Sequence, residues 1–220
     1  TISGTGGQQG ATGNVGVSIF GASPVVSSQG ADITIIGQGG NGTSSEGIAI
    51  AAGTVGVATG TASANVILTS DSTRLQTTAI NSGTGTTTIG GSGALIVTAS
   101  GALSTGQVNL VSAGQIQVAA GVTLGNNITI SYASGTSGQG TIRMLDTTGT
   151  ATVSGNITIN NGATLLGTGI IGGNTTIAAG GKLAFNLNSS PASHDKLELG
   201  ASRSLTFSGS SQVTVSGFAE

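Results

Sequence analysis

The sequence repeats itself with a period of about 33 residues, which lies in the range typical of repeat architectures. The chain opens at Thr1 with TISGTGG, and TIIGQGG begins at Thr34. A second pair of similar runs, GVSIFG at Gly16 and GIAIAAG at Gly47, has a slightly shorter spacing. In such architectures each repeat is one small structural unit. We therefore expect strands that keep their register while the loops between them vary in length.

The apolar residues occur in short alternating runs. Runs such as ANVILTS and SQVTVSG alternate apolar and polar residues, and many of them end at glycine. This alternation is typical of half-buried strands, and strands this short need neighbours on both sides to be stable.

The last third of the chain shows the order of the strands within one repeat. A strand of the form Asn-Xaa-Thr-Ile starts at Asn127, Asn156 and Asn174, and GATLLG and TGIIGG lie between the last two copies. This order predicts coils of three short strands with tight corners. Glycine adopts positive φ at such corners without steric cost, and asparagine tolerates the same region.

Composition excludes several classes of protein. The chain has 41 glycines among 220 residues, only 5% charged and 2% aromatic residues, and 36% hydrophobic residues. Ordinary globular domains carry about 25% charge. Disordered chains combine low hydrophobicity with high net charge, whereas this chain has a net charge of −2 and a mean hydropathy of +0.31. A repetitive, folded β-protein fits these values.

We predict an all-β fold, a parallel right-handed β-helix solenoid with short three-strand coils and glycine-rich turns. Coils stacked at the inter-strand spacing would give about 7 to 11 coils and a rod of about 35 to 50 Å. An antiparallel sandwich is the alternative. We interpret residues 1–220 as a single segment of a longer repeat protein, with long repeats in 1–77, denser strands in 78–154 and a third pattern in 155–220.

The third pattern resembles a known family. From Gly155 to Val215 the pieces GNITI, GATLLG, TGIIGG, NTTIAAGGKL and HDKLEL follow one another, and this order resembles the strand repeats of bacterial autotransporter passenger domains. DITIIGQGGNG and GIAIAAG resemble the haemagglutinin-like repeats of large surface proteins. The resemblance implies type V secretion and display at the bacterial cell surface, with an outer-membrane translocator outside this segment. It also implies a structural stalk or adhesin role.

Parallel β-helices also bind or process polysaccharides, which requires carboxylates or bases that converge in one groove. Here the charged residues are scattered, apart from His194, Asp195 and Lys196 with Glu198. In the resembled family the HDKLEL insert is a loop entering a strand, which places Lys196 and Glu198 toward solvent and Leu197 and Leu199 inward. We therefore predict a non-enzymatic protein and assign no catalytic, cofactor-binding or metal-binding residue. The acidic residues are Asp32, Glu46, Asp71, Asp146, Asp195, Glu198 and Glu220, and the basic residues are Arg74, Arg143, Lys182, Lys196 and Arg203.

Smaller motifs have structural interpretations. Asp71 and Arg74 are predicted to form a surface ion pair of little energetic weight. GQGGNGTSS lacks the aspartate that calcium-binding glycine-rich repeats require, and no helix follows the glycines to bind phosphate. Glycosylation sequons, which we interpret as structural, begin at Asn41, Asn127, Asn156, Asn174 and Asn188.

The partners that remain are surface glycans or other cells. Nucleic acid is disfavoured because the chain has no basic stripe. Direct membrane insertion of this segment is disfavoured because no run of about 18 apolar residues occurs. Threonines in TTTIG, NITI and NTTI are expected to face outward, and a threonine ladder leaves an ice-binding solenoid as a further alternative. Unpaired strand edges on the end coils predict end-to-end self-association.

Overall fold

The structure is a computed structural model of the 220-residue chain. The residues that it describes are 1–7, 14–20, 25–41, 46–50, 54–57, 65–70, 72–75, 80–81, 85–90, 94–103, 106–111, 115–131, 141–145, 149–187 and 194–217.

The described strands form a three-sided rod. The first sheet contains β1 (Ile2–Thr5), β4 (Ile33–Gln38), β7 (Val66–Ser70), β10 (Thr87–Gly90), β12 (Val108–Val111), β15 (Ile128–Ser131), β18 (Ile157–Ile159), β20 (Thr175–Ile177) and β23 (Leu205–Phe207). The second sheet contains β2 (Val17–Ile19), β5 (Ile48–Ile50), β8 (Ser72–Leu75), β11 (Ala94–Val97), β13 (Gln115–Ala119), β16 (Thr141–Leu145), β19 (Thr164–Ile171), β21 (Lys182–Asn186) and β24 (Gln212–Ser216).

The third side is built in two parts. The first part contains β3 (Val25–Ser28), β6 (Thr54–Val57) and β9 (Ile80–Asn81). The second part contains β14 (Thr123–Leu124), β17 (Thr152–Val153), the end of β19 and β22 (Leu197–Leu199). Between them, Leu103 forms a parallel bridge to Ile80 of β9.

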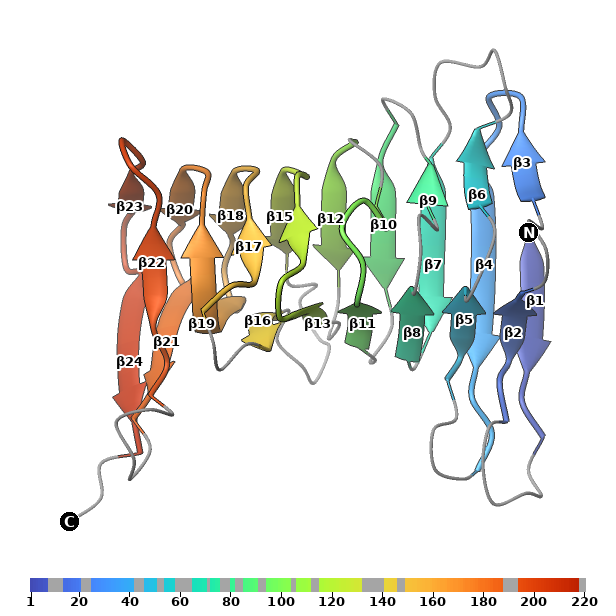
Figure 1. The fold of residues 1–220 in the computed structure, drawn as a ribbon, viewed down its shortest axis with the longest axis horizontal. Coiled ribbons are helices and arrows are strands. Elements are labelled where there is room, and N and C mark those ends of the chain that lie inside the picture. Colours follow the sequence, from blue (N-terminus) through green and yellow to red (C-terminus); the bar gives the residue numbers. More distant parts are fainter. Residues whose placement is uncertain are drawn as a thin grey trace.

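All pairings between the described strands are parallel, and neighbours in each sheet come from successive passes of the chain. Figure 1 shows the resulting rod, with the first strands at one end and the last strands at the other. The predicted parallel β-helix is confirmed, and the antiparallel sandwich is wrong. Nine strands in the first sheet correspond to eight steps, or about 38 Å at the usual inter-strand spacing.

The register of the strands confirms the repeats found in the sequence. Ile2 lies beside Ile35, and Val17 lies beside Ile48, so the similar runs at Thr1 and Thr34 and at Gly16 and Gly47 are neighbours in space. Thr175 lies beside Ile157 in the same sheet, although the chain between them is much shorter. Coils therefore differ widely in length while their strands stay aligned, because the loops absorb the difference.

The core consists of columns of aliphatic side chains that run along the rod. One column in the first sheet contains Ile35, Leu68, Ile89, Leu110, Ile130, Ile159 and Ile177. Each of these side chains is at most 2% exposed. Because side chains alternate between the two faces of a strand, the residues between them face outward. Most of the interior is apolar, and the buried polar side chains among the described residues are Thr87, Asn126, Thr164 and Thr175.

One expectation about the corners needs correction. Among the described residues Ser202 is the only non-glycine with positive φ, so the described asparagines do not use the left-handed region that they tolerate. GATLLG and TGIIGG, which we expected to be two strands with a corner between them, are not separated in this way. They form one strand, β19, which pairs with β16 up to Thr168 and with β17 from Ile170.

The bend within β19 depends on glycine. Gly167 has φ of +103°, and a Cβ atom there would lie 2.5 Å from the carbonyl oxygen of Met144 on β16. A side chain would therefore meet both backbone strain and the backbone of the preceding coil. This contact explains how β19 passes from the second sheet to the third side without a loop.

Candidate functional site

The predicted polar cluster that begins at His194 holds the insert against the rod. The backbone N–H of Asp195 donates to the carbonyl oxygen of Asn186 at 3.0 Å, and Oδ2 of Asp195 accepts from the backbone N–H of Asn186 at 2.9 Å. This reciprocal pair fixes the end of the insert to the end of β21. The carboxylate of Asp195 is therefore occupied by a structural hydrogen bond.

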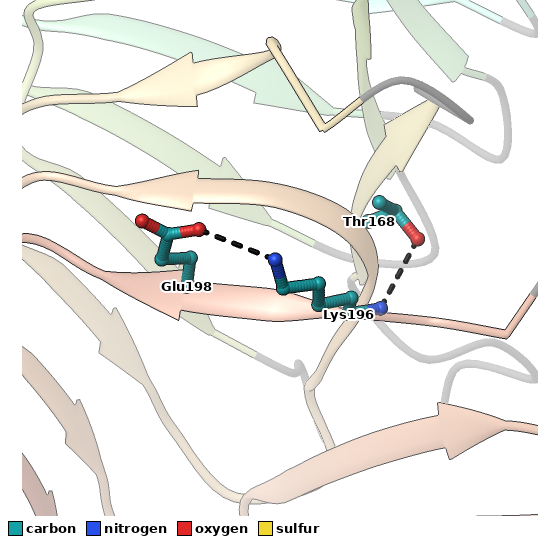
Figure 2. A network of polar contacts seen from close by, with 3 residues as sticks. All are labelled: Thr168, Lys196 and Glu198. Carbon is teal, nitrogen blue, oxygen red and sulfur yellow. Dashed lines mark hydrogen bonds and ion pairs between the residues drawn. The ribbon is translucent and has the colours of Figure 1, made fainter.

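Figure 2 shows how the same segment meets the preceding coil. The backbone N–H of Lys196 donates to Oγ1 of Thr168 at 3.1 Å, and Oγ1 of Thr168 donates to the carbonyl oxygen of His194 at 3.3 Å. The Lys196 Nζ atom lies 3.4 Å from Oε2 of Glu198, and these side chains are 75% and 62% exposed. An ion pair so open to water contributes little to stability.

The expected orientation of this strand is confirmed in part. Lys196 and Glu198 face solvent, and Leu197 is half-buried against the core. Leu199, which we expected to be buried, is 39% exposed. The reason is that β22 is the last described strand on the third side, so no further described coil covers Leu199.

The remaining charged residues do not gather into a site within the described part of the chain. The described residues contain no group of three or more His, Asp or Glu that could hold a metal ion. Arg143 lies on the exposed face of β16, and Asp32 accepts a hydrogen bond at 2.9 Å from Nδ2 of Asn65. Asp71, Asp146, Asn188, Glu220 and the side chain of Arg74 lie outside the described part.

A ladder of polar side chains occupies the corner before the first sheet. Oδ1 of Asn127 accepts from the backbone N–H of Asn156, and Oδ1 of Asn156 accepts from that of Asn174, both at 2.9 Å. Asn174 in turn accepts from the backbone N–H of Ser204 at 3.1 Å. Each asparagine oxygen therefore takes the place of a backbone carbonyl acceptor, so that the amide at the same corner of the next coil has a hydrogen-bond partner although these positions are exposed.

The same corner is polar in the earlier coils. Oδ1 of Asn65 accepts from the backbone N–H of Thr86 at 3.0 Å, and Nε2 of Gln107 donates to Oγ1 of Thr129 at 2.9 Å. Asn127, Asn156 and Asn174 were predicted to be structural, whereas Asn65 and Gln107 were not singled out from the sequence. The signal that could have found them is their position, since each stands immediately before a strand of the first sheet.

Most outward threonines of the first sheet lie in one column along the rod. In order along the rod, the column contains Thr34, Ile67, Thr88, Asn109, Thr129, Thr158, Thr176 and Thr206. The expectation that the threonines of TTTIG, NITI and NTTI face outward is confirmed for Thr88, Thr129, Thr158 and Thr176, which are aligned with one another. It is wrong for Thr87 and Thr175, which are 2% and 1% exposed and face inward. The aligned threonines are half-buried by their neighbours, and Thr206 in the last coil is exposed.

The column beside it is not regular. It contains Ser3, Ile36, Thr69, Gly90, Val111 and Ser131 in successive coils. The outer face of the first sheet therefore carries one column that is mostly threonine, while the column next to it has no repeated residue type.

No helix in the described residues has the length and apolar character needed to cross a bilayer. No protein-family model, curated protein or solved structure matches this chain. The resemblance to autotransporter passengers stays a prediction, and function has to be inferred from the geometry of the rod.

Proposed function

We propose that this chain is a non-catalytic, rod-shaped segment of an exported bacterial surface protein, which acts as a stalk and presents its outer faces for adhesion. The observation that carries this proposal is the continuous core column, in which seven successive side chains from Ile35 to Ile177 are at most 2% exposed. A core that runs the length of the molecule makes a stiff spacer, because every coil is held by its neighbours through backbone hydrogen bonds.

The surface chemistry supports a structural role over catalysis. The cluster with the most titratable groups, at His194 to Glu198, is tied into the fold through Thr168 and Asn186. The ion pair between Lys196 and Glu198 is open to solvent. General acid–base chemistry needs groups held together around a substrate position, and the described charged residues do not provide this arrangement.

A stalk is defined by its length, so the test removes one whole coil. Deletion of residues 156–173 would remove β18 and β19 and join Gly155 to Asn174, which leaves the corner ladder able to re-form between Asn127 and Asn174. We expect the shortened protein to fold and its rod to lose about 4.8 Å, one inter-strand step. Deletion of residues 165–173, half of the same coil, is the control and should not fold.

The functional measurement places the chain between a cell-surface anchor and a peptide tag. Capture of the cells by antibody-coated beads should decrease as the rod is shortened by one coil and then by several, with folding checked by circular dichroism. If capture were lost completely on removal of a single coil that still folds, a localised site would be responsible and the stalk proposal would be wrong. Binding of the purified rod to a glycan array tests the adhesive part separately.

Ice binding is a second candidate, favoured by the single threonine column. The column repeats at the coil spacing through Thr129, Thr158 and Thr176, as a lattice-matched surface would need. Matching a crystal plane also requires order in the second direction, and the neighbouring column varies from Ile36 to Gly90. An ice-recrystallisation assay separates the two functions, since a stalk should leave crystal growth unchanged.

A further inference from the structure

The charged residues are distributed unevenly over the three sides of the rod. The described strands of the first sheet contain no charged residue, and the described strands of the third side contain one, Glu198. The described strands of the second sheet contain three, and all of them are basic: Arg74, Arg143 and Lys182. The strands of the second sheet therefore carry positive charge alone.

Two of these cations occupy outward positions in the middle of the rod. Arg143 is exposed between Ile142 and Met144 of β16, which are buried. Lys182 is half-buried at the start of β21, next to the buried Leu183. Neither the Arg143 guanidinium nor the Lys182 ammonium forms an ion pair or a side-chain hydrogen bond with the described residues. Both charges can therefore bind an anion from solution.

The register of the sheet sets the distance between the two cations. Thr141, two residues before Arg143 on β16, lies beside Thr164, and Thr164 lies beside Lys182. Lys182 is therefore two strand spacings and two residues away from Arg143, or about 12 Å between the Cα atoms at the usual dimensions of a sheet. This distance is close to the length of a disaccharide.

The neighbours of Arg143 offer both polar and apolar contacts. Gln117 lies beside it in the preceding coil and Leu166 in the following coil. Ile96 lies on the other side of Gln117, and Nε2 of Gln117 donates to Oε1 of Gln115 at 3.1 Å. Amide and guanidinium groups bind hydroxyl and carboxylate oxygens. Aliphatic side chains pack against the C–H groups of a sugar ring, so this face combines the two kinds of contact that a charged sugar needs.

We propose that the outer face of the second sheet, from β11 to β21, binds an acidic polysaccharide that lies along the rod and carries about one carboxylate or sulfate per disaccharide. The inference rests on the adhesive part of the proposed function and names its class of ligand. Successive acidic groups of such a polymer have the spacing of Arg143 and Lys182, which is the charge complementarity that selects it.

Nucleic acid fits this face less well. Duplex DNA carries one negative charge per about 1.7 Å of its axis, a density far above that of two cations about 12 Å apart. Proteins that bind single strands stack the bases on aromatic side chains. The outward positions of β13, β16, β19 and β21 contain no aromatic residue, and Phe185 of β21 packs against the core.

Two double variants remove the same charge from different sides of the rod. Arg143→Gln with Lys182→Gln removes both cations from the second sheet. Lys196→Gln with Arg203→Gln is the matched control, because Lys196 lies on the third side and Arg203 in the turn before β23. Both double variants change the net charge by the same amount. Circular dichroism and thermal unfolding first show that they are folded.

Biolayer interferometry on immobilised hyaluronan and chondroitin sulfate gives the readout, with dextran as a neutral polysaccharide and oligothymidylate as a nucleic acid. We expect the unmodified chain to bind at least one acidic polysaccharide and to bind more weakly as salt is added. The second-sheet variant should bind about three- to tenfold more weakly, since each exposed charge pair contributes little. The control variant should bind like the unmodified chain.

Three results would overturn the inference. They are no binding to either acidic polysaccharide at low salt, an equal loss in the two double variants, and tighter binding to oligothymidylate. Binding to dextran alone would also overturn the ligand class but would keep the adhesive role, and the stalk role is tested separately by the deletion of a coil.

Discussion

Replacement of Gly167 by alanine should destabilise the protein more than the same change at a positive-φ glycine in an open turn. Gly167 lies in the middle of β19, where φ is +103°, and an added Cβ would meet the backbone of Met144 at 2.5 Å from its oxygen and 2.9 Å from its nitrogen. The conformational strain costs about 1 to 3 kcal/mol. Forcing a methyl group against packed backbone costs about 1 to 3 kcal/mol more.

The two costs together predict a loss of about 2 to 6 kcal/mol in the free energy of unfolding. Gly121→Ala separates them, because Gly121 has φ of +71° but no atom within 4 Å of the added Cβ. Gly121→Ala should lower the free energy of unfolding by about 1 to 2 kcal/mol, the cost of the backbone strain alone. Gly125→Ala, whose φ is not positive and whose nearest atom is 4.0 Å away, should change stability by less than about 0.5 kcal/mol.

Urea unfolding followed by far-ultraviolet circular dichroism measures the three variants against the unmodified chain. Because a solenoid can unfold in parts, hydrogen exchange should also show faster exchange in β16 and β19 of Gly167→Ala than in β4 and β7. The reasoning would be refuted if Gly167→Ala lost no more stability than Gly121→Ala, since the close approach to Met144 would then have no energetic consequence.

Three further substitutions test single contacts by the same unfolding measurement. Thr175→Val should stabilise the protein by about 1 kcal/mol, because Oγ1 of Thr175 is buried without a hydrogen-bond partner; the outward Thr176→Val should not. Asn156→Ala should cost about 0.5 to 1.5 kcal/mol by removing the acceptor for the amide of Asn174, whereas Asn156→Asp, which keeps an oxygen there, should cost less. Lys196→Ala should change stability by less than about 1 kcal/mol, since its ion pair is exposed. A large loss there, or no gain for Thr175→Val, would contradict these assignments.

The strand repeats could be predicted because they depend on alternation alone. Val, Ile and Leu at every second position can be buried together only if one face of each strand points inward, and the repeat spacing already aligned Ile2 with Ile35. The role of the asparagines could not be derived in this way. Conformational preference explained only why Asn127 and Asn156 fit a turn, whereas in the structure their amide oxygens accept hydrogen bonds from the next coil.

The exposure of Leu199 shows the same limit of local reasoning. Its place in the alternating pattern predicts burial, but burial of a strand residue in a solenoid requires a coil on each side, and β22 has a described neighbour on one side only. The sequence likewise showed that charged residues are concentrated at His194, but not what they contact. The attachment of this cluster to Thr168 and Asn186 depends on which coil lies beneath it.

The order of apolar residues by itself therefore determined that this chain forms short stacked strands, because hydrophobic burial at alternate positions depends on little beyond the chain itself. Tertiary structure decided which side chains from different coils meet, since coils of unequal length are aligned by contacts between neighbours and not by the number of residues between strands. It is those contacts that place most outward threonines of the first sheet in one column and turn β19 around a corner at Gly167.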